Sequence, residues 1–242
     1  MIDAARADLA PTGILRAGIN MGNILLVTGA RPDGDPDGVS PDLAEAIAER
    51  LGVALQLVPF ASPGELADAV DDDVWDIALV GAEPQRAEKI EFSPPYAEIE
   101  STYLVPAGSS LQSIEDVDQA GVRLIVSARS AYGLWLERNV KLATLVPATN
   151  PAEALQRFVD EGLDALAGLR PALLDEATKL PGSRVLPGQF ASVQQAVGTR
   201  RVNEAGAAFL RDFVEEAKSS GLVAQLIAKH GVEGRLSLAP PA

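Results

Sequence analysis

The 242-residue chain has no cysteine, a single histidine and few positive charges. The absence of cysteine excludes a disulfide framework, a thiolate zinc site and a cysteine nucleophile. Because His230 is the only histidine, the sequence also excludes a histidine-rich metal site and disfavours a histidine-based catalytic triad. We therefore expect no metal site and no cofactor.

The charge balance is strongly acidic, with 20 Lys and Arg residues against 34 Asp and Glu residues, a formal charge of −14. A nucleic-acid-binding protein needs a basic surface, and so does a protein that docks on an anionic membrane, so both classes are disfavoured. The apolar runs are much shorter than the roughly 18–20 residues that a membrane-spanning helix requires. We expect no direct insertion into a membrane.

The first 15 residues carry Asp3, Arg6 and Asp8 and contain no continuous apolar segment. They do not look like a secretory signal, which needs a central apolar stretch. If Met1 is the native start, this predicts a cytoplasmic protein. A chain from which a signal had been removed would look the same.

Short apolar runs alternate with segments of helical periodicity along most of the chain, which is typical of parallel β-α-β units. Ser40 and Pro41 are expected to begin a helix that Gly52 ends, and Ser62 is expected to cap the next one. The predicted strands are residues 14–19, 53–58, 75–80, 122–126, 144–146, 165–167 and 184–186; the predicted helices are residues 43–51, 65–70, 131–139, 151–161, 171–179, 205–219 and 222–229.

Two consecutive α/β halves of similar make-up indicate two lobes. Residues 101–105 and 192–198 are strand-like and could connect the lobes in both directions. We therefore predict a discontinuous first lobe of residues 1–104 plus 192–242 and a second lobe of residues 105–191.

Several segments resemble the family 3 extracellular solute-binding proteins. The likeness is carried by the glycine-flanked helix of residues 38–52, the strand and loop of residues 75–86, the Glu-Phe-Ser-Pro-Pro-Tyr segment of residues 91–96, and residues 113–126. The resemblance implies a type II periplasmic-binding (Venus-flytrap) α/β fold, in which two lobes close on a ligand by a hinge. It also implies a monomeric periplasmic protein, not an enzyme, that captures a small carboxylate-bearing amino acid or organic acid for an ABC permease.

The resemblance implies a first ligand loop at Gly81, Ala82, Glu83 and Arg86, in which the arginine holds the ligand carboxylate. A guanidinium can grip a carboxylate with two parallel hydrogen bonds. The alternative is an exposed arginine at a helix start that pairs with a neighbouring glutamate. Glu83 stands where the family usually has a hydroxyl residue, so it could neutralise Arg86 or bind an ammonium group.

A second ligand segment is expected at Arg129, Ser130, Ala131 and Tyr132, after a strand and at the start of a helix. Free amides and the helix dipole favour an anion there. Ser130 is expected to cap the helix. The family usually has a glycine–threonine pair in this loop, so Arg129 is either a contact for a second anionic group or a surface arginine.

Leu169, followed by Arg170, occupies the place where amino-acid-binding members of the family usually have an aspartate for the α-ammonium group. An ammonium group buried against leucine would cost several kcal/mol. We therefore expect that the protein does not hold an ordinary α-amino acid in the usual pose.

Asn20 and Asn23 could form part of a ligand wall, or could serve only as turn residues. Phe60 and Tyr132 could stack on a ligand, or could belong to the core. Gln194 and Gln195 lie near the second connection between the lobes and could reach the ligand. His230 is expected to be a surface or C-terminal capping residue.

Two other functions fit the same fold. One is a dehydratase-like enzyme that uses Glu83 as its acid or base. The other is a cytoplasmic sensor in which ligand binding is signalled to a partner.

Overall fold

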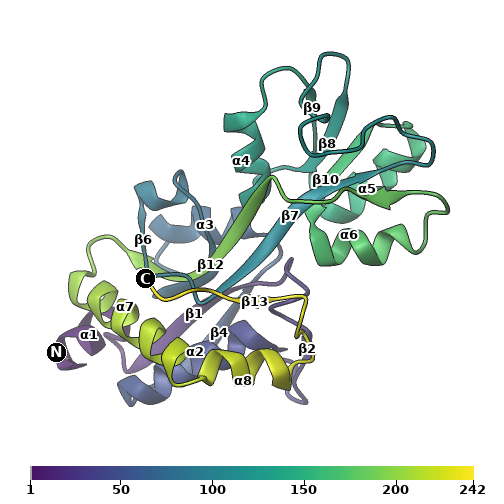
Figure 1. The fold of residues 1–242 in the computed structure, drawn as a ribbon. Coiled ribbons are helices and arrows are strands. Elements are labelled where there is room, and N and C mark those ends of the chain that lie inside the picture. Colours follow the sequence, from purple (N-terminus) through teal and green to yellow (C-terminus); the bar gives the residue numbers. More distant parts are fainter. Residues whose placement is uncertain (1) are drawn as a thin grey trace. The chain divides into compact units, whose positions relative to one another are not determined.

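A computed structural model describes residues 2–242, and contacts divide the chain into two compact units (Figure 1). Unit 1 comprises the described residues up to Glu98 together with Gln194–Ala242, and unit 2 comprises Ile99–Val193. These boundaries differ by two to six residues from the predicted divisions after residues 104 and 191. None of the helices described is long and apolar enough to cross a membrane.

Unit 1 has a sheet of strand order β4-β1-β5-β12, in which β1 runs parallel to β4 and β5, and β12 is antiparallel to β5. Its elements are α1 (Ile2–Leu9), β1 (Ile14–Asn20), β2 (Gly29–Ala30), β3 (Pro36–Asp37), α2 (Val39–Leu51), β4 (Ala54–Phe60), α3 (Pro63–Asp68), η1 (Ala69–Asp71), β5 (Ile77–Ala82), η2 (Arg86–Glu88), β6 (Ile90–Phe92), α7 (Glu204–Ser219), α8 (Leu222–Lys229) and β13 (Ser237–Leu238). Two strands, β7 (Ala97–Val105) and β12 (Ala191–Arg200), run through the division between the units.

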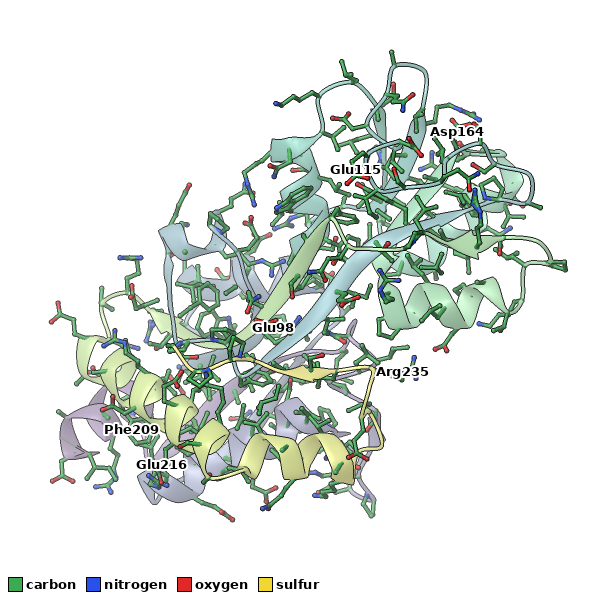
Figure 2. All side chains as sticks on the ribbon, viewed as in Figure 1. Glu98, Glu115, Asp164, Phe209, Glu216 and Arg235 are labelled. Atoms are coloured by element: carbon green, nitrogen blue, oxygen red, sulfur yellow. The ribbon has the colours of Figure 1, made fainter. Side chains whose placement is uncertain are left out.

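Helices cover both faces of the unit 1 sheet. Leu66 of α3 packs with Trp75 and with Ala78 and Val80 of β5 in one apolar cluster. Since side chains alternate along a strand, Ile77 and Leu79 face the other way. On that side α2, α7 and α8 lie together (Figure 1). Arg50 of α2 makes two hydrogen bonds of 2.8 and 2.7 Å with Glu216 of α7. Figure 2 labels Glu216 on α7.

Helix α2 begins at Val39, earlier than the sequence pattern predicts, and Ser40 is not its cap. The N-cap position is Gly38, with φ 152°, where a Cβ atom would lie 2.3 Å from the carbonyl oxygen of Leu26. Only glycine tolerates this close approach. The Ser40 hydroxyl instead lies 3.0 Å from the hydroxyl of the buried Tyr96. The predicted end of the helix at Gly52 is confirmed, with Gly52 in the left-handed conformation.

A buried ion pair fixes the start of the central strands of unit 1. The Asp76 carboxylate accepts hydrogen bonds from Nε and Nη2 of Arg16 at 3.0 and 2.8 Å, and from its backbone N–H at 2.8 Å. Asp76 is fully buried and Arg16 is partly buried. Because three donors converge on one carboxylate, the pair fixes the register at which β1 enters the sheet beside β5.

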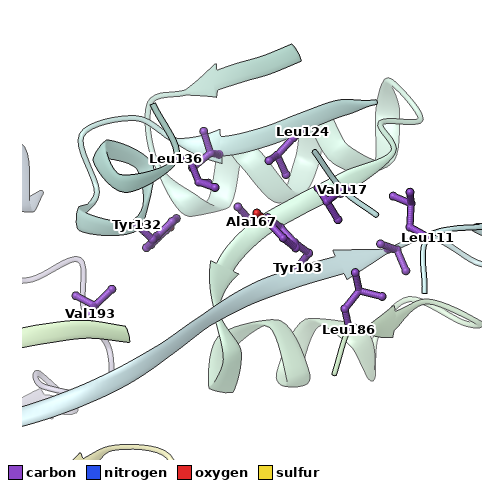
Figure 3. Packing of buried hydrophobic residues seen from close by; sticks show 12 residues of the cluster. Tyr103, Leu111, Val117, Leu124, Tyr132, Leu136, Ala167, Leu186 and Val193 are labelled. Carbon is purple, nitrogen blue, oxygen red and sulfur yellow. The ribbon is translucent and has the colours of Figure 1, made fainter. Parts of the chain in front are cut away.

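Unit 2 has a sheet of strand order β7-β10-β8-β9, in which β8, β9 and β10 are parallel and β7 is antiparallel to β10. Its elements are β8 (Arg123–Ser127), α4 (Ala131–Asn139), β9 (Thr144–Ala148), α5 (Pro151–Asp160), β10 (Ala165–Leu169), α6 (Arg170–Ala177) and β11 (Arg184–Val185). Figure 3 shows part of its core, in which Tyr103, Leu124, Tyr132 and Leu136 pack around the sheet.

Further features were not predicted correctly from the sequence, among them the short strands β2, β3 and β6. Residues 2–9 form helix α1, and residues 237–238 form strand β13, although no element was expected in either place. His230 lies at the C-cap of α8, as expected, but it is not a surface residue, because its side chain is only 4% exposed.

Candidate functional site

The carboxyl ends of three parallel strands meet at one edge of the unit 1 sheet. Asn20 at the end of β1 is paired with Phe60 at the end of β4, and Ile19 is paired with Leu79 of β5. The segments that follow these strands are therefore neighbours, which is the usual position of a binding site in a parallel α/β sheet. We call the group of Asn20, Phe60, Glu83 and Arg86 the strand-end site of unit 1.

Arg86 is buried, with 7% of its surface exposed, and its side chain folds back to the strand that precedes it. Its Nη1 donates to the carbonyl oxygen of Gly81 at 2.7 Å. The tight loop after β5 makes this contact, because Arg86 begins the short helix η2 four residues after the strand ends. Arg86 thus lies at a helix start, as the alternative interpretation expected, but it is buried and not exposed.

Glu83 is also buried, with 5% exposure, between Gly81 and Arg86 in the same loop. Its carboxylate accepts a hydrogen bond from the backbone N–H of Gln85 at 2.9 Å. The strand-end site thus contains one buried carboxylate and one buried guanidinium within four residues, and Ala82, between Gly81 and Glu83, is partly buried. Such a loop can bind a charged group with limited competition from water.

The two asparagines of the strand-end region have turn roles. The side-chain oxygen of Asn20 accepts the N–H of Gly22 at 3.0 Å, and that of Asn23 accepts the N–H of Leu25 at 3.1 Å. These contacts fix the loop after β1, as the turn interpretation predicted. Phe60 is partly buried and packs against the cluster beneath α3, which supports the core interpretation.

In unit 2, Ser130 caps helix α4 as predicted. Its Oγ accepts the N–H of Gly133 at 2.9 Å and donates to the carbonyl oxygen of Ser127 at 2.7 Å. The close approach of this loop needs a glycine at position 133, because a Cβ atom there would lie 2.6 Å from the Ser127 oxygen. The helix start, at Ala131, lies directly after the carboxyl end of β8, as an anion site would require.

Arg129 is exposed and adopts φ 60°, in the left-handed region. A residue with a Cβ atom is strained there, whereas glycine is not. A glycine at this position would relieve the strain.

Tyr132 lies in the core of unit 2 and is 7% exposed. Burial raises the pKa of its phenol above the ordinary value, and hydrogen bonds with Ser130 and Ser127 oppose that shift. The core interpretation of Tyr132 is therefore the better supported one.

Leu169 is partly buried at the end of β10 and packs against the core of unit 2. It lies directly opposite Ser101 of β7. Arg170 donates from Nε to Glu100 at 2.5 Å and from its terminal nitrogens to the carbonyl oxygens of Leu186 and Gly188. These contacts give Arg170 a structural role in joining α6 to β7 and to the segment after β11.

Asp37, Asp42 and His230 bring three potential metal-ligand atoms within 4.8 Å of one another in unit 1. Two cations already bind Asp42, because Lys229 Nζ lies 2.6 Å and Arg31 Nη2 lies 2.8 Å from its oxygens. A carboxylate neutralised in this way is a poor metal ligand. We interpret the group as a structural ion cluster.

Several buried side-chain atoms have no hydrogen-bond partner among residues 2–242, and two of them belong to uncharged side chains, in the long strands β7 and β12. These two are Oε1 of Gln195 in β12 and the hydroxyl of Ser101 in β7. Gln195 was noted only for its position, and Ser101 only as part of a connecting strand. Local sequence patterns do not report whether a buried group is satisfied, because the partners come from distant strands.

One family model matches most of the chain. The family model described as "Bacterial extracellular solute-binding proteins, family 3" matches residues 25–233. A probable histidine-binding protein of Neisseria gonorrhoeae is 24% identical over 209 residues, which are 81% of this chain and 75% of that relative. Cyclohexadienyl dehydratase of Pseudomonas aeruginosa is 30% identical over 138 residues, 55% of this chain and 51% of the relative, so the chain spans about half of its length.

Solved structures show the same fold. An amino acid ABC transporter substrate-binding protein from Streptococcus pneumoniae, bound to L-arginine, matches with a TM-score of 0.75 and 20% identity over 92% of this chain and 96% of its own. An ancestral amino-acid-binding protein, described as a precursor of cyclohexadienyl dehydratase, matches with a TM-score of 0.74 and 23% identity over 94% and 97%. Together with the strand order, these likenesses confirm the predicted α/β periplasmic-binding-protein-like fold.

Proposed function

Because the chain belongs to the bacterial extracellular solute-binding proteins, family 3, we propose that it captures a small carboxylate-bearing solute for uptake by an ABC transporter. The observation that carries this proposal is the burial of Arg86 at the carboxyl ends of three parallel strands, fixed by its hydrogen bond to the Gly81 carbonyl. Within the proposal, the protein works outside the cytoplasm and its macromolecular partner is a permease.

Arg86 would bind the solute carboxylate. Charge-assisted hydrogen bonds are about twice as strong as neutral ones. They are stronger still where water is largely excluded, as around Arg86, a residue that is only 7% exposed. The contact with Gly81 restricts the side chain before the solute arrives, which lowers the entropy lost on binding.

Ser130 and the start of α4 would form a second anion-binding element, in unit 2. The supporting features are the capped helix start and its position at the carboxyl end of β8. Arg129, in the same loop, would add positive charge. These features favour a solute with more than one polar group.

Leu169 argues against an α-ammonium group in the usual family position. It is an apolar, partly buried side chain packed on the unit 2 core, and it offers no acceptor to a cation. Within the proposal, an organic acid is a better solute than an α-amino acid.

Titration calorimetry of the purified protein tests the proposal. The panel is the twenty amino acids together with malate, lactate, succinate and propionate. We expect at least one organic acid to bind more tightly than every amino acid, and to stabilise the protein by about 2.7 kcal/mol at a free concentration one hundred times its Kd. Binding of an amino acid more tightly than every organic acid would contradict the organic-acid preference, and no binding at all would contradict carboxylate capture.

The dehydratase relative supports a second candidate function, since Glu83 is a buried carboxylate in the strand-end site. In that case Glu83 would supply or remove the proton in loss of water from a cyclohexadienyl substrate. The test is aromatic product formation by the wild type and by Glu83→Gln. Turnover by the wild type that the substitution abolishes would support catalysis; no turnover by either would leave solute capture as the function.

A further inference from the structure

Gln195 is buried in the middle of a sheet with an unsatisfied polar atom. Its residue is 2% exposed, and its Oε1 accepts no hydrogen bond from any residue between 2 and 242. Buried amide oxygens are nearly always hydrogen-bonded, because removing them from water without a replacement is unfavourable. An exception in the interior of unit 1 therefore requires a reason.

The position of Gln195 provides one. In the antiparallel pair of β12 and β5, Gln195 lies directly opposite Gly81, and the Gly81 carbonyl is the group that accepts the hydrogen bond of Arg86. Residues directly opposite each other have their side chains on the same face of the sheet. Since glycine has no side chain, nothing from that position packs against the amide of Gln195.

The backbone around Gln195 is fixed. Its own carbonyl oxygen accepts the N–H of Tyr96 at 2.8 Å, and Tyr96 is anchored in turn by the hydroxyl of Ser40. The amide is thus held beside the strand end on which Arg86 rests. Gln194, the preceding residue of the strand, is only partly buried and faces the other side of the sheet.

We propose that Gln195 is a specificity-determining contact in the strand-end site, and that its Oε1 accepts a hydrogen bond from a neutral donor on the solute that Arg86 holds. This inference rests on the proposed capture of a carboxylate. The amide oxygen of Gln195 is uncharged and cannot neutralise a buried cation, so the donor that fits it best is a hydroxyl group. The solute class is therefore a hydroxy acid, and the analogue without the hydroxyl should bind less tightly.

Malate with succinate, and lactate with propionate, are two pairs of probes that differ in one hydroxyl group. Calorimetry is carried out on the wild type, on Gln195→Met and on Gln194→Met. We expect the wild type to prefer the hydroxy acid of at least one pair, and Gln195→Met to weaken its binding about 5- to 10-fold, as the loss of one hydrogen bond predicts. Binding of the analogue without the hydroxyl should change less than twofold, and Gln194→Met should change neither.

The thermal stability of the ligand-free variants provides a separate measurement. Methionine fills about the same volume as glutamine without a buried acceptor, so Gln195→Met should melt at the same temperature as the wild type or up to about 2–4 °C higher. A lower melting temperature would show that the buried amide of Gln195 stabilises the ligand-free protein, and would overturn the inference. Equal hydroxy-acid affinity in Gln195→Met and the wild type would also overturn it.

The outcomes separate two failures. If the wild type binds hydroxy acids and Gln195→Met binds them equally well, only the role of Gln195 is wrong. If the wild type binds no carboxylate on the panel, the proposed function fails, and the inference fails with it.

Discussion

Nε2 of His230 lies 2.7 Å from Oδ2 of Asp42, which joins the end of α8 to the first turn of α2. Lys229 binds the same carboxylate, and Arg31 binds it from the segment between β2 and β3. Helix α8, near the end of the chain, is therefore held by ion pairs and hydrogen bonds to α2, near its beginning. A carboxylate in the first turn of a helix also interacts favourably with the helix dipole.

The Asp42 cluster predicts acid sensitivity. Burial alone would raise the pKa of Asp42, but hydrogen bonds from Lys229, His230 and Arg31 outweigh it and hold the pKa below the ordinary value. A lowered folded-state pKa contributes stability that is present above the unfolded-state pKa of about 3.9 and is lost as the pH falls through the folded-state pKa.

Asp42→Asn should accordingly reduce the free energy of unfolding by about 2–3 kcal/mol at pH 7, since it weakens hydrogen bonds to charged groups. The difference from the wild type should shrink as the pH is lowered below 4. Urea unfolding at several pH values measures both curves. A difference that stays constant down to pH 2 would show that Asp42 is not the group responsible.

Ser101 and Thr102 are adjacent in β7, and both are fully buried, but only the Thr102 hydroxyl has a hydrogen-bond partner among the described residues. The Thr102 hydroxyl lies 3.2 and 3.1 Å from the carbonyl oxygens of Leu186 and Gly188, whereas the Ser101 hydroxyl has no partner among residues 2–242. Ser101→Ala should therefore leave the free energy of unfolding unchanged or slightly higher, and Thr102→Val should lower it by about 1 kcal/mol. Chemical denaturation of the two variants checks the contrast, and equal losses would contradict it.

The left-handed conformation of Arg129 predicts a stabilising substitution. Glycine avoids a strain of roughly 1–2 kcal/mol in this region, and loses part of that gain through its freer unfolded state. Arg129→Gly should raise the free energy of unfolding by about 0.5–1 kcal/mol, while Arg129→Ala, which keeps a Cβ atom, should not.

The same two variants separate two effects on carboxylate binding. If both variants weaken binding equally, the lost charge is the cause. Weaker binding by the glycine variant alone would point to loop flexibility.

Local sequence signals predicted several elements well. The bounds of α4 and α8 agree with the prediction because each is marked at its own ends, α4 by Ser130 and α8 by Gly221 and Gly231. The start of α2 was misplaced because serine is a common N-cap residue, so the sequence pattern favours Ser40 as the cap. The true N-cap, Gly38, must be glycine because the carbonyl oxygen of the distant Leu26 leaves no room for a Cβ atom. Helix α1 was missed because its apolar face is short and is buried by contact with the distant helices α7 and α2.

The candidate site was predicted only in part, because local sequence signals locate some of its residues and pairings between distant segments determine the others. Arg86 and Ser130 follow strands directly, so their positions are set by the local order of elements. The burial of His230 depends on Asp42, which is 188 residues away in the sequence, and the unsatisfied amide of Gln195 depends on β5. Such pairings between distant segments leave no periodic pattern in the chain.

The affinity of Arg86 variants for the tightest-binding carboxylate is the most direct test of the account. Arg86→Met should weaken binding by at least about 100-fold and Arg86→Lys by about 10-fold, because lysine keeps the charge and loses the planar pair of donors. Arg157→Met is the control and should bind as the wild type does, because Arg157 is a partly exposed residue of α5 that pairs with Glu161 of unit 2. If Arg86→Met, correctly folded, binds the carboxylate within threefold of the wild type, Arg86 does not hold the solute and the account is wrong.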